Sequence, residues 1–335
     1  MTVKGSKVRW GVLGTARIAT RKVIPAMQRG AWSEVVAIAS RDAAKAGDAA
    51  RTLGIDRAHG SYEELLADPD VDAIYNPLPN HLHVPWSVRA ATAGKHVLCE
   101  KPIALNAAEA RGLLTVRDRT GVHIAEAFMV RLHPQWIKVR ELVGSGRIGE
   151  LRVVTGHFSY LKTDPDNVRN RVEWGGGGLL DIGCYPVMLA RWLYGVEPMR
   201  VLALMERDPE MWVDRLTAGL LDFGAAHASF TVGTQMTNAQ YMELVGTAGR
   251  ISLPLPFSPA PGQRTTVTCN GEIIEFDAVD QFTLQADAFA RAVHGLADAP
   301  MTLEDSVANM TVLDALFRSA ASQNWEKPEA GATPA

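Results

Sequence analysis

The chain has 335 residues, of which 47% are hydrophobic and 21% are charged, and its formal net charge is −3. This composition is typical of a globular protein of about two domains, and it excludes a disordered or fibrous chain. The balanced charge argues against nucleic acid as a partner, and no run of about 18 apolar residues predicts a membrane-spanning helix.

The first third of the chain predicts a parallel sheet. The segment Met1–Lys7 is polar and has no apolar signal core, so we expect a cytoplasmic protein. Strands are expected at Val8–Leu13, Val35–Ala39, Ala73–Tyr75, His96–Cys99 and Val122–Ala125. Helices are expected at Ile18–Arg29 and Asp42–Leu53, after the capping box Ser61–Glu64, at Val84–Ala93, and from Asn106 to about Arg117. Repeated β-α-β units predict a Rossmann-type, doubly wound α/β sheet.

The second half predicts a different architecture. Successive strands are expected at Leu151–Tyr160, Arg200–Arg207, Arg215–Phe223, Ala226–Thr234, Tyr241–Gly246 and Thr265–Phe276. The Asn270-Gly271 turn is a strong hairpin signal, so these strands are expected to form an open, mostly antiparallel α+β sheet. Two helices, Phe282–His294 and Leu303–Ala321, follow. We therefore expect two domains, over 1–130 and 131–335. This prediction allows the C-terminal helices to pack back on the first domain.

A candidate phosphate-binding turn follows the first strand. It consists of the consecutive residues Gly14, Thr15, Ala16, Arg17, Ile18 and Ala19. Only Gly14 matches a glycine of the G-x-G-x-x-G pattern, and alanine is the smallest substitute at the other two positions. The helix that starts near Ile18 offers free N–H groups to a phosphate. An ordinary strand–turn–helix is the alternative, but the position in the first β-α unit favours a dinucleotide.

The end of the second strand indicates which dinucleotide is bound. An NAD site usually has an acidic residue there, whereas this chain has Ser40 and Arg41, followed by Lys45. A hydroxyl and two cations suit a 2′-phosphate, so NADP is favoured over NAD. The alternative is that the two cations are solvated charges at a helix start.

Two further polar segments follow strands, where ligands bind in open α/β sheets. One contains Pro77, Leu78, Asn80 and His83, and the other is Glu100-Lys101-Pro102. On chemistry alone, a surfacing strand that stops at proline explains the second segment equally well. His81 and His83 are too closely spaced to predict a metal site without further ligands, and no metal is expected. The three cysteines have no C-x-x-C spacing and are expected to be reduced, structural thiols.

Several motifs together resemble those of the Gfo/Idh/MocA oxidoreductase family. They are Pro79-Asn80-x-x-His83, Ala93–Val97, Glu100-Lys101-Pro102, Glu126–Met129, Gly176–Tyr185 and Leu303–Asn309, and they span nearly the whole chain. The resemblance implies an N-terminal dinucleotide domain, a second domain with an open antiparallel sheet, and a homodimer formed through the open sheet face. It also implies that Lys101 lies beside the nicotinamide and that the bond before Pro102 is cis.

The residue four after Asp181 separates branches of that family. Inositol dehydrogenase-like members have histidine there. Tyr185 is similar to the branch of glucose–fructose oxidoreductase, aldose–aldose oxidoreductase, xylose dehydrogenase and dihydrodiol dehydrogenase. Ser40 and Lys45 also resemble the 2′-phosphate contacts of the sugar branch. Val130 departs from the tyrosine found in many of these relatives, so the resemblance leaves the shape of the sugar pocket open.

The residue chemistry leads to the same catalytic set of Lys101, Asp181 and Tyr185. Asp181 and Tyr185 have i, i+4 spacing, which places them on one helix face. A neighbouring ammonium, Lys101, would favour the phenolate of Tyr185, so that Tyr185 serves as general base while Asp181 orients Lys101 or binds a substrate hydroxyl. The alternatives are a helix N-terminal charge for Asp181 and a buried, hydrogen-bonded ring for Tyr185. Further residues expected to bind substrate are Arg131, Tyr160, Asn167 and Arg169.

The sequence thus predicts an NADP-dependent sugar oxidoreductase. Hydride would move between C1 of an aldose of the glucose or xylose type and nicotinamide, giving an aldonolactone. A second sugar would act as oxidant if NADP stays bound. The alternatives are a dihydrodiol dehydrogenase-like alcohol oxidoreductase and a catalytically silent NADP-binding sensor. In each case the expected partner is a small molecule. For the sugar oxidoreductase this partner is a sugar or polyol substrate.

Overall fold

The computed structural model describes residues 7–329, which form two compact units. Unit 1 comprises residues 7–104, 109–132 and 280–306, and unit 2 comprises the remaining described residues. Each unit is described by itself below. None of the helices formed by residues 7–329 combines the length and apolar character that crossing a membrane requires.

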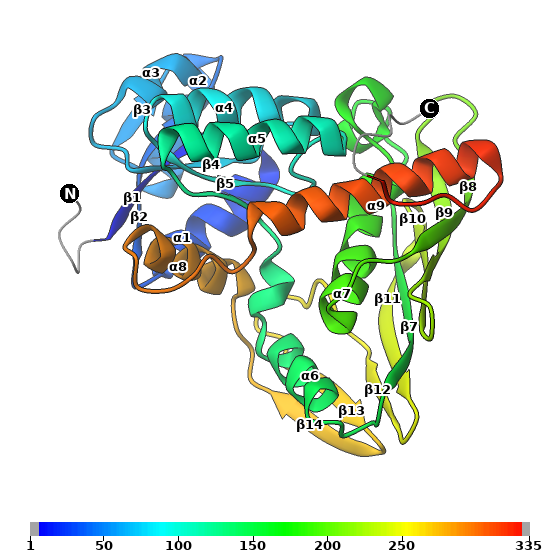
Figure 1. Cartoon of the computed structure of the whole chain (residues 1–335). Helices are drawn as coiled ribbons and strands as arrows, with labels where there is room; N and C mark the ends of the chain where they lie inside the picture. The colour runs from blue at the N-terminus through cyan, green and yellow to red at the C-terminus, as the bar shows by residue number, and fades with distance from the viewer. Residues whose placement is uncertain (1–6, 330–335) are drawn as a thin grey trace. The chain divides into compact units, whose positions relative to one another are not determined.

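Unit 1 contains a six-stranded parallel sheet (Figure 1). Its strands are β1 (Val8–Leu13), β2 (Ser33–Ala39), β3 (Arg57–His59), β4 (Ala73–Asn76), β5 (His96–Cys99) and β6 (Ile124–Glu126). Their spatial order is β3-β2-β1-β4-β5-β6, the order of a dinucleotide-binding Rossmann sheet. The strand order reverses between β1 and β4, so the loops that follow these two strands lie at the point where such sheets bind ligands.

Helices cover both faces of this sheet. They are α1 (Ile24–Arg29), α2 (Ala43–Leu53), α3 (Tyr62–Ala67), α4 (His83–Thr92), α5 (Ala107–Thr120) and α8 (Gln281–Val293). In Figure 1, α4 and α5 lie together on one face, and α1 and α8 lie together on the other. Asp42 and Ser61 cap α2 and α3 by accepting hydrogen bonds from backbone N–H groups of the first turn.

Helix α8 completes the core of unit 1 although it lies far along the chain. The rings of Trp10 and Phe289 are 5.3 Å apart, and both are fully buried. Asp287 accepts hydrogen bonds from the N–H groups of Ala31 and Trp32 at 2.9 and 3.0 Å. The apolar face of α8 and this carboxylate therefore fix the helix to the first sheet.

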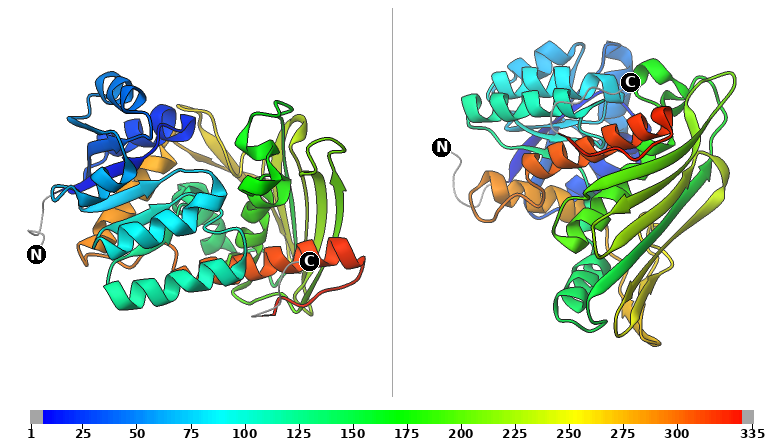
Figure 2. Two further views of the ribbon diagram at one scale, coloured as in Figure 1. Left: turned by 90° about the horizontal axis from the view of Figure 1, so that it is seen from above. Right: turned by 45° about the vertical axis from the view of Figure 1, so that its right-hand side comes forward.

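Unit 2 contains an eight-stranded sheet, seen in the right view of Figure 2. Its strands are β7 (Leu151–Leu161), β8 (Arg200–Arg207), β9 (Asp214–Asp222), β10 (His227–Gly233), β11 (Gln235–Gly246), β12 (Arg250–Leu253), β13 (Thr265–Cys269) and β14 (Glu272–Phe276). The order is β14-β13-β12-β11-β7-β10-β9-β8, and every pair is antiparallel except β7 with β10. The mixed architecture of the two sheets confirms the predicted fold class.

One face of this second sheet is packed and the other is exposed. The helices α6 (Pro134–Gly144), α7 (Cys184–Tyr194) and the part of α9 (Leu303–Ser322) from residue 307 onward belong to unit 2. The opposite face carries Leu204, Leu216 and Leu220, whose exposed fractions are 76%, 38% and 44%. Cross-strand register places them on one face, because Leu204 pairs with Ala218 and Leu202 pairs with Leu220.

Three elements were not predicted. Strand β3 has three residues, and each is only partly buried or exposed, so it carries no apolar run. Strand β12 is four residues long and lies between a turn and a long loop. Helix α6 starts with Pro134 at its first position after the cap His133, whose Nδ1 accepts from the Gln135 N–H. Strands as short as β3 and β12, and a helix that starts with a histidine cap, give weak sequence signals, which explains why these elements were not predicted.

Candidate active site

The first strand ends in the tight turn that the sequence predicts. Gly14 has a φ of +79°, and its N–H donates to the Ala39 carbonyl at 2.8 Å. A Cβ at Gly14 would lie 3.1 Å from Cδ2 of Leu78, so a side chain would both strain the backbone and crowd the next loop. Helical backbone begins at Arg17, and the Thr20 N–H donates to the Ala16 carbonyl. The N–H groups that precede Thr20 are those a phosphate can use.

The end of β2 carries the residues predicted to select the nucleotide. Ser40 is buried, and its Oγ accepts from the Asp42 N–H at 3.2 Å. Arg41 is exposed, and its guanidinium lies beside the hydroxyl of Tyr62. Burial raises the pKa of Tyr62 while Arg41 opposes that shift. The ammonium of Lys45 lies 3.7 Å from the Asp42 carboxylate and is largely exposed. Both cations are therefore accessible to an anion.

His83 connects the two polar loops that follow β4 and β5. Its Nε2 lies 2.7 Å from the Leu78 carbonyl oxygen, and its Nδ1 lies 2.7 Å from the Pro102 carbonyl oxygen. Burial lowers the pKa of His83 to about 4, although the two carbonyls favour the protonated ring. Asn76 donates to the His83 carbonyl and accepts from the Leu78 N–H. In this structure His83 holds backbone rather than presenting a free ring nitrogen.

The Glu100-Lys101-Pro102 segment has the predicted backbone geometry. The Lys101–Pro102 peptide bond is cis, which confirms that expectation. Glu100 Oε1 accepts from the Tyr75 hydroxyl at 2.6 Å, and the Glu100 N–H donates to the Asn76 carbonyl. Strand β4 thus holds the start of the loop, and His83 holds its Pro102 carbonyl. Lys101 lies between these two attachments.

Unit 2 brings three of the predicted substrate residues together. The Tyr160 hydroxyl donates to Asp181 Oδ2 at 2.5 Å, and Arg169 Nε donates to the same oxygen at 2.9 Å. The carboxylate raises the pKa of the Arg169 guanidinium, and burial raises the pKa of the Tyr160 hydroxyl. The Tyr160 and Arg169 donors therefore converge on one oxygen of Asp181. The Arg169 side chain is still 42% exposed, so its remaining N–H groups can reach a ligand.

Tyr185 lies one helical turn after Asp181, as the i, i+4 spacing predicts. Its side chain is 5% exposed, and its ring packs against those of Phe158 and Phe257 at centroid distances of 6.0 and 5.7 Å. Phe158 and Phe257 stack on each other at 4.7 Å. Arg169 interacts electrostatically with the Tyr185 hydroxyl. The aromatic rings fix the phenol, and a cation favours its ionised form.

One anchor of this region has no local sequence signal. Asp214 is fully buried, and it accepts from the Leu179 N–H at 2.6 Å and from the Thr217 hydroxyl at 2.9 Å. A Cβ at Gly177 would lie 1.9 Å from Asp214 Oδ1, so only glycine permits this approach. Burial raises the pKa of Asp214 to about 6. Leu179 is 35 positions away along the chain, so spacing could not reveal the contact.

The other predicted substrate residues have protein partners within their own units. Arg131 forms an ion pair with Asp305 in unit 1. The Asn167 side chain accepts from the Arg169 N–H at 3.1 Å and caps a short 3-10 turn in unit 2. Lys101 belongs to unit 1, whereas Asp181 and Tyr185 belong to unit 2. None of the three cysteines forms a disulfide, and residues 7–329 contain no group of three or more His, Cys, Asp or Glu suited to a metal ion.

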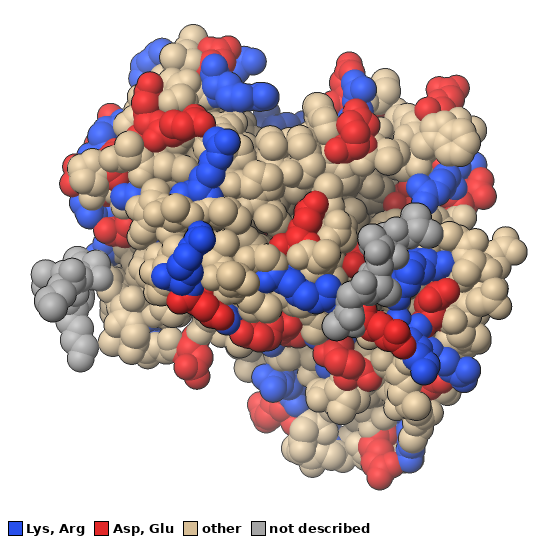
Figure 3. All heavy atoms as spheres, turned by 45° about the horizontal axis from the view of Figure 1, so that its top comes forward, with Lys and Arg blue, Asp and Glu red and all other residues tan. Residues whose placement is uncertain are grey.

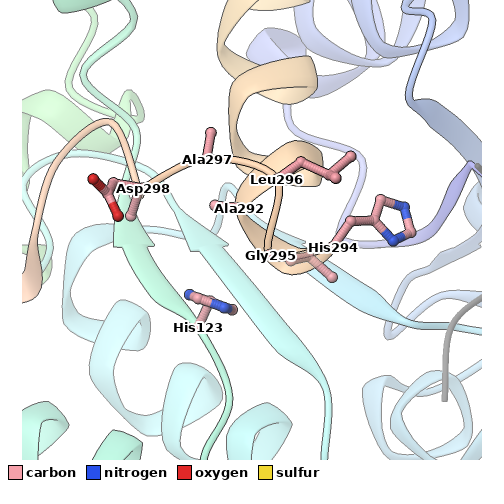
Figure 4. A pocket seen from close by; sticks show the side chains of 9 residues that line it. His123, Ala292, His294, Gly295, Leu296, Ala297 and Asp298 are labelled. Atoms are coloured by element: carbon pink, nitrogen blue, oxygen red, sulfur yellow. The ribbon is translucent and has the colours of Figure 1, made fainter. Parts of the chain in front are cut away.

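Unit 1 also has an open depression, and the residues that line it are none of those predicted for the site. It is lined by His123 and by residues 292–299, as Figure 4 shows. His123 directly precedes β6, so the depression lies near the start of that strand rather than at its carboxyl end. On the molecular face shown in Figure 3, positive and negative side chains are interspersed. That face offers no extended basic surface of the kind that binds nucleic acid.

The sequence matches two family models in series. Residues 8–128 match the model "Oxidoreductase family, NAD-binding Rossmann fold" of GFO/IDH/MocA, and residues 136–252 match the "GFO/IDH/MocA C-terminal domain". The two models together cover both the first sheet and most of the second.

Curated relatives align over most of the chain. An uncharacterized oxidoreductase, ORF334, of Rhizobium meliloti is 46% identical over 95% of this chain and 98% of its own. D-xylose 1-dehydrogenase (NADP(+)) 2 of Haloferax volcanii is 38% identical over 93% of this chain and 97% of its own. Trans-1,2-dihydrobenzene-1,2-diol dehydrogenase of Mus musculus is 33% identical over 80% of each chain.

Solved structures have the same fold. KijD10, a 3-ketoreductase of Actinomadura kijaniata solved with NADP and TDP-benzene, has a TM-score of 0.87 and 33% identity over 93% of this chain and 97% of its own. Aldose-aldose oxidoreductase of Caulobacter crescentus, solved with glycerol, has a TM-score of 0.88 and 27% identity over 96% of this chain and 99% of its own. With both domain models matched in order, the chain belongs to the Gfo/Idh/MocA family and is an oxidoreductase.

Proposed function

We propose that this protein is an NADP-dependent sugar oxidoreductase that moves hydride between C1 of an aldose and nicotinamide. The observation that carries the proposal is the arrangement of unit 2. A phenol, Tyr185, lies one helical turn from an aspartate that is held by Tyr160 and Arg169. Such a group of hydroxyls and charges suits a polyhydroxylated substrate whose hydroxyl must lose a proton. Relatives named as a xylose dehydrogenase and an aldose-aldose oxidoreductase support the aldose assignment.

The residues of the chain divide the chemistry between them. Tyr185 takes the proton from the C1 hydroxyl and returns it in the reverse direction. Lys101 donates to the reacting oxygen and stabilises negative charge there. Arg169 favours the phenolate of Tyr185, and Asp181 holds Arg169 in place. When bound, the dinucleotide supplies the nicotinamide that exchanges hydride with C1.

The experiment is turnover with a panel of single aldoses. We expect NADP, added or carried by the purified protein, to be reduced by a pyranose such as xylose or glucose, with the aldonolactone detected by mass spectrometry. If the dinucleotide copurifies, a second sugar should reoxidise it. Reduction of NADP by no aldose in the panel would contradict the proposal.

A dihydrodiol dehydrogenase-like alcohol oxidoreductase is the second candidate. The partly buried ring of Phe158 beside Tyr185 favours it, because an apolar ring suits a cyclic hydrocarbon diol better than a sugar. The same Lys101 and Tyr185 would serve that reaction. Including trans-1,2-dihydrobenzene-1,2-diol in the panel separates the two, since the better substrate has the higher kcat/KM.

Ser40, Arg41 and Lys45 bind the 2′-phosphate of NADP in this proposal, and the turn at Gly14, Thr15 and Ala16 holds the pyrophosphate. Arg41→Ala removes a charge-assisted contact, so we expect the KM for NADP to rise about 10- to 100-fold while that for NAD changes little. Initial rates at varied dinucleotide concentration measure both constants. Arg51→Ala, an exposed arginine on α2, is the control. Equal effects on NADP and NAD would contradict the assignment.

The exposed face of the second sheet is proposed to pair two copies of the chain. Exposed leucines on β8 and β9 form an apolar surface that water disfavours. We expect a dimer by sedimentation velocity, and Leu204→Glu should convert it to a monomer because it buries two charges at a two-fold contact. Ile137→Glu, an exposed position on α6, should leave the dimer intact. A monomeric wild-type protein at micromolar concentration would contradict this proposal.

A further inference from the structure

Glu126 is a buried carboxyl beside the loop that carries Lys101. It is the last residue of β6 and pairs in register with Cys99 on β5. Glu126 is only 2% exposed. Glu126 Oε1 accepts from the Ile103 N–H at 2.9 Å. The carboxyl thus holds the backbone immediately after the cis peptide bond. This attachment is distinct from those made by Tyr75 to Glu100 and by His83 to Pro102.

The second carboxyl oxygen is not used for packing the loop. Among residues 7–329, Glu126 Oε2 has no hydrogen-bond partner and is buried. A carboxylate in that position lacks the solvation that stabilises its charge. Burial therefore raises the pKa of Glu126 to about 8, and Lys101 opposes the shift. The group is protonated at neutral pH and titrates in a mildly alkaline range.

The charged and titratable groups that face Glu126 come from three neighbouring elements. Lys101 lies on the loop after β5, and its cation favours the carboxylate. Asp305 at the start of α9 disfavours it, and is itself paired with Arg131, while Ser306 and the Ile103 N–H stabilise the anion. The buried thiol of Cys99 has its pKa raised well above the usual range, so it stays neutral. Of these groups, Lys101 is the cation that favours the ionised carboxyl.

We propose that Glu126 is a positioning residue for Lys101: it fixes the Lys101 loop through the Ile103 amide, and its proton determines the electric field at the Lys101 amine. The inference rests on the proposed function of Lys101. While the carboxyl is neutral, it does not oppose the field of the Lys101 ammonium at the substrate oxygen. Once the carboxyl ionises, part of that field is cancelled, and turnover falls on the alkaline side.

The first test is the pH dependence of kcat/KM for aldose oxidation. In the wild type we expect an alkaline decrease with a midpoint near the pKa of Glu126, so that activity at one pH unit above it is about tenfold lower. Glu126→Gln keeps an acceptor for the Ile103 N–H and cannot ionise, so that decrease should disappear. Glu63→Gln, an exposed residue on α3, is the matched control and should keep it. An unchanged alkaline limb in Glu126→Gln would overturn the proposal.

A second measurement does not depend on catalysis. An amine-reactive reagent, trinitrobenzenesulfonate, is added to the protein without substrate, and labelling of each lysine is followed by peptide mass spectrometry. Near pH 9 the ionised Glu126 should protect the Lys101 amine, so Glu126→Gln should label several-fold faster there, while Lys138 on α6 is unaffected. Equal labelling would refute the coupling. A labelling difference in a protein that oxidises no aldose would refute the proposed function and leave the coupling supported.

Glu126→Asp guards against a variant that loses its fold. It retains an ionisable group but is too short to hold the Ile103 N–H in the same place. We therefore expect a lower kcat with the alkaline limb still present, and circular dichroism compares the fold of all variants. Loss of the limb in Glu126→Asp would contradict the assignment of the titration to this carboxyl.

Discussion

Tyr185→Phe is expected to lower kcat/KM for aldose oxidation by about 10²- to 10⁴-fold, the range in which a positioned general base contributes. The change removes only the hydroxyl. The ring keeps its contacts with Phe158 and Phe257, so the packing of α7 should persist. The loss should therefore fall mainly on kcat, because the proton of the substrate hydroxyl has no acceptor.

Steady-state rates at varied aldose concentration measure that loss, and thermal unfolding checks the fold. Tyr194→Phe is the matched control. Tyr194 is the last residue of α7, and its hydroxyl donates to the His227 carbonyl, so removal of this hydroxyl should change kcat/KM little. Tyr160→Phe should be intermediate, since it removes a hydrogen-bond donor to Asp181. Turnover of Tyr185→Phe within a factor of a few of the wild type would exclude this residue as the base.

Lys101→Met is expected to lower kcat by about 10²- to 10³-fold, comparable with loss of one oxyanion-stabilising donor. Methionine fills similar space without a charge, so the loop between the Tyr75–Glu100 and His83–Pro102 contacts should remain in place. Dinucleotide binding should change much less than turnover, because the residues proposed to contact the pyrophosphate and the 2′-phosphate lie on other loops. Fluorescence titration with NADP measures the binding constant separately from the rate.

Lys101→Arg sharpens this test. The variant keeps the charge but replaces a compact ammonium by a planar fork, so it should recover only part of the activity. Lys138→Met, at a partly exposed position of α6, serves as the control. If Lys101→Met and the wild type had the same kcat, Lys101 would be limited to holding its loop.

The first sheet could be predicted from the sequence because its strands are continuous apolar runs between capped helices. β1 and β5 have the predicted bounds, and Asp42 and Ser61 start α2 and α3 as their patterns indicate. β3 could not be predicted, since a three-residue edge strand without an apolar run gains its order from β2 alone. The strands of the second sheet other than β12 were predicted, but the parallel pair of β7 with β10 depends on the meander that separates them.

The candidate site was predictable to the level of residue type and not of contact. The i, i+4 spacing predicted that Asp181 and Tyr185 share one helix face, and the family resemblance identified Lys101 as a candidate catalytic residue. Neither the spacing nor the resemblance could show that Asp181 accepts hydrogen bonds from Tyr160 and Arg169, which lie 21 and 12 positions away. Contacts between residues separated in sequence arise from the tertiary fold, where no periodic pattern specifies the partner.

The return of α8 to the first sheet has a consequence for synthesis of the protein on the ribosome. The hydrogen bond from the Trp32 N–H to the Asp287 carboxylate joins residues that are 255 positions apart. The early β-α units therefore leave the ribosome with Trp10 lacking its Phe289 neighbour, and the apolar face that α8 covers stays open until nearly the whole chain has been translated. Nascent chains stalled before residue 280 should be bound by chaperones, and release should follow once α8 has emerged.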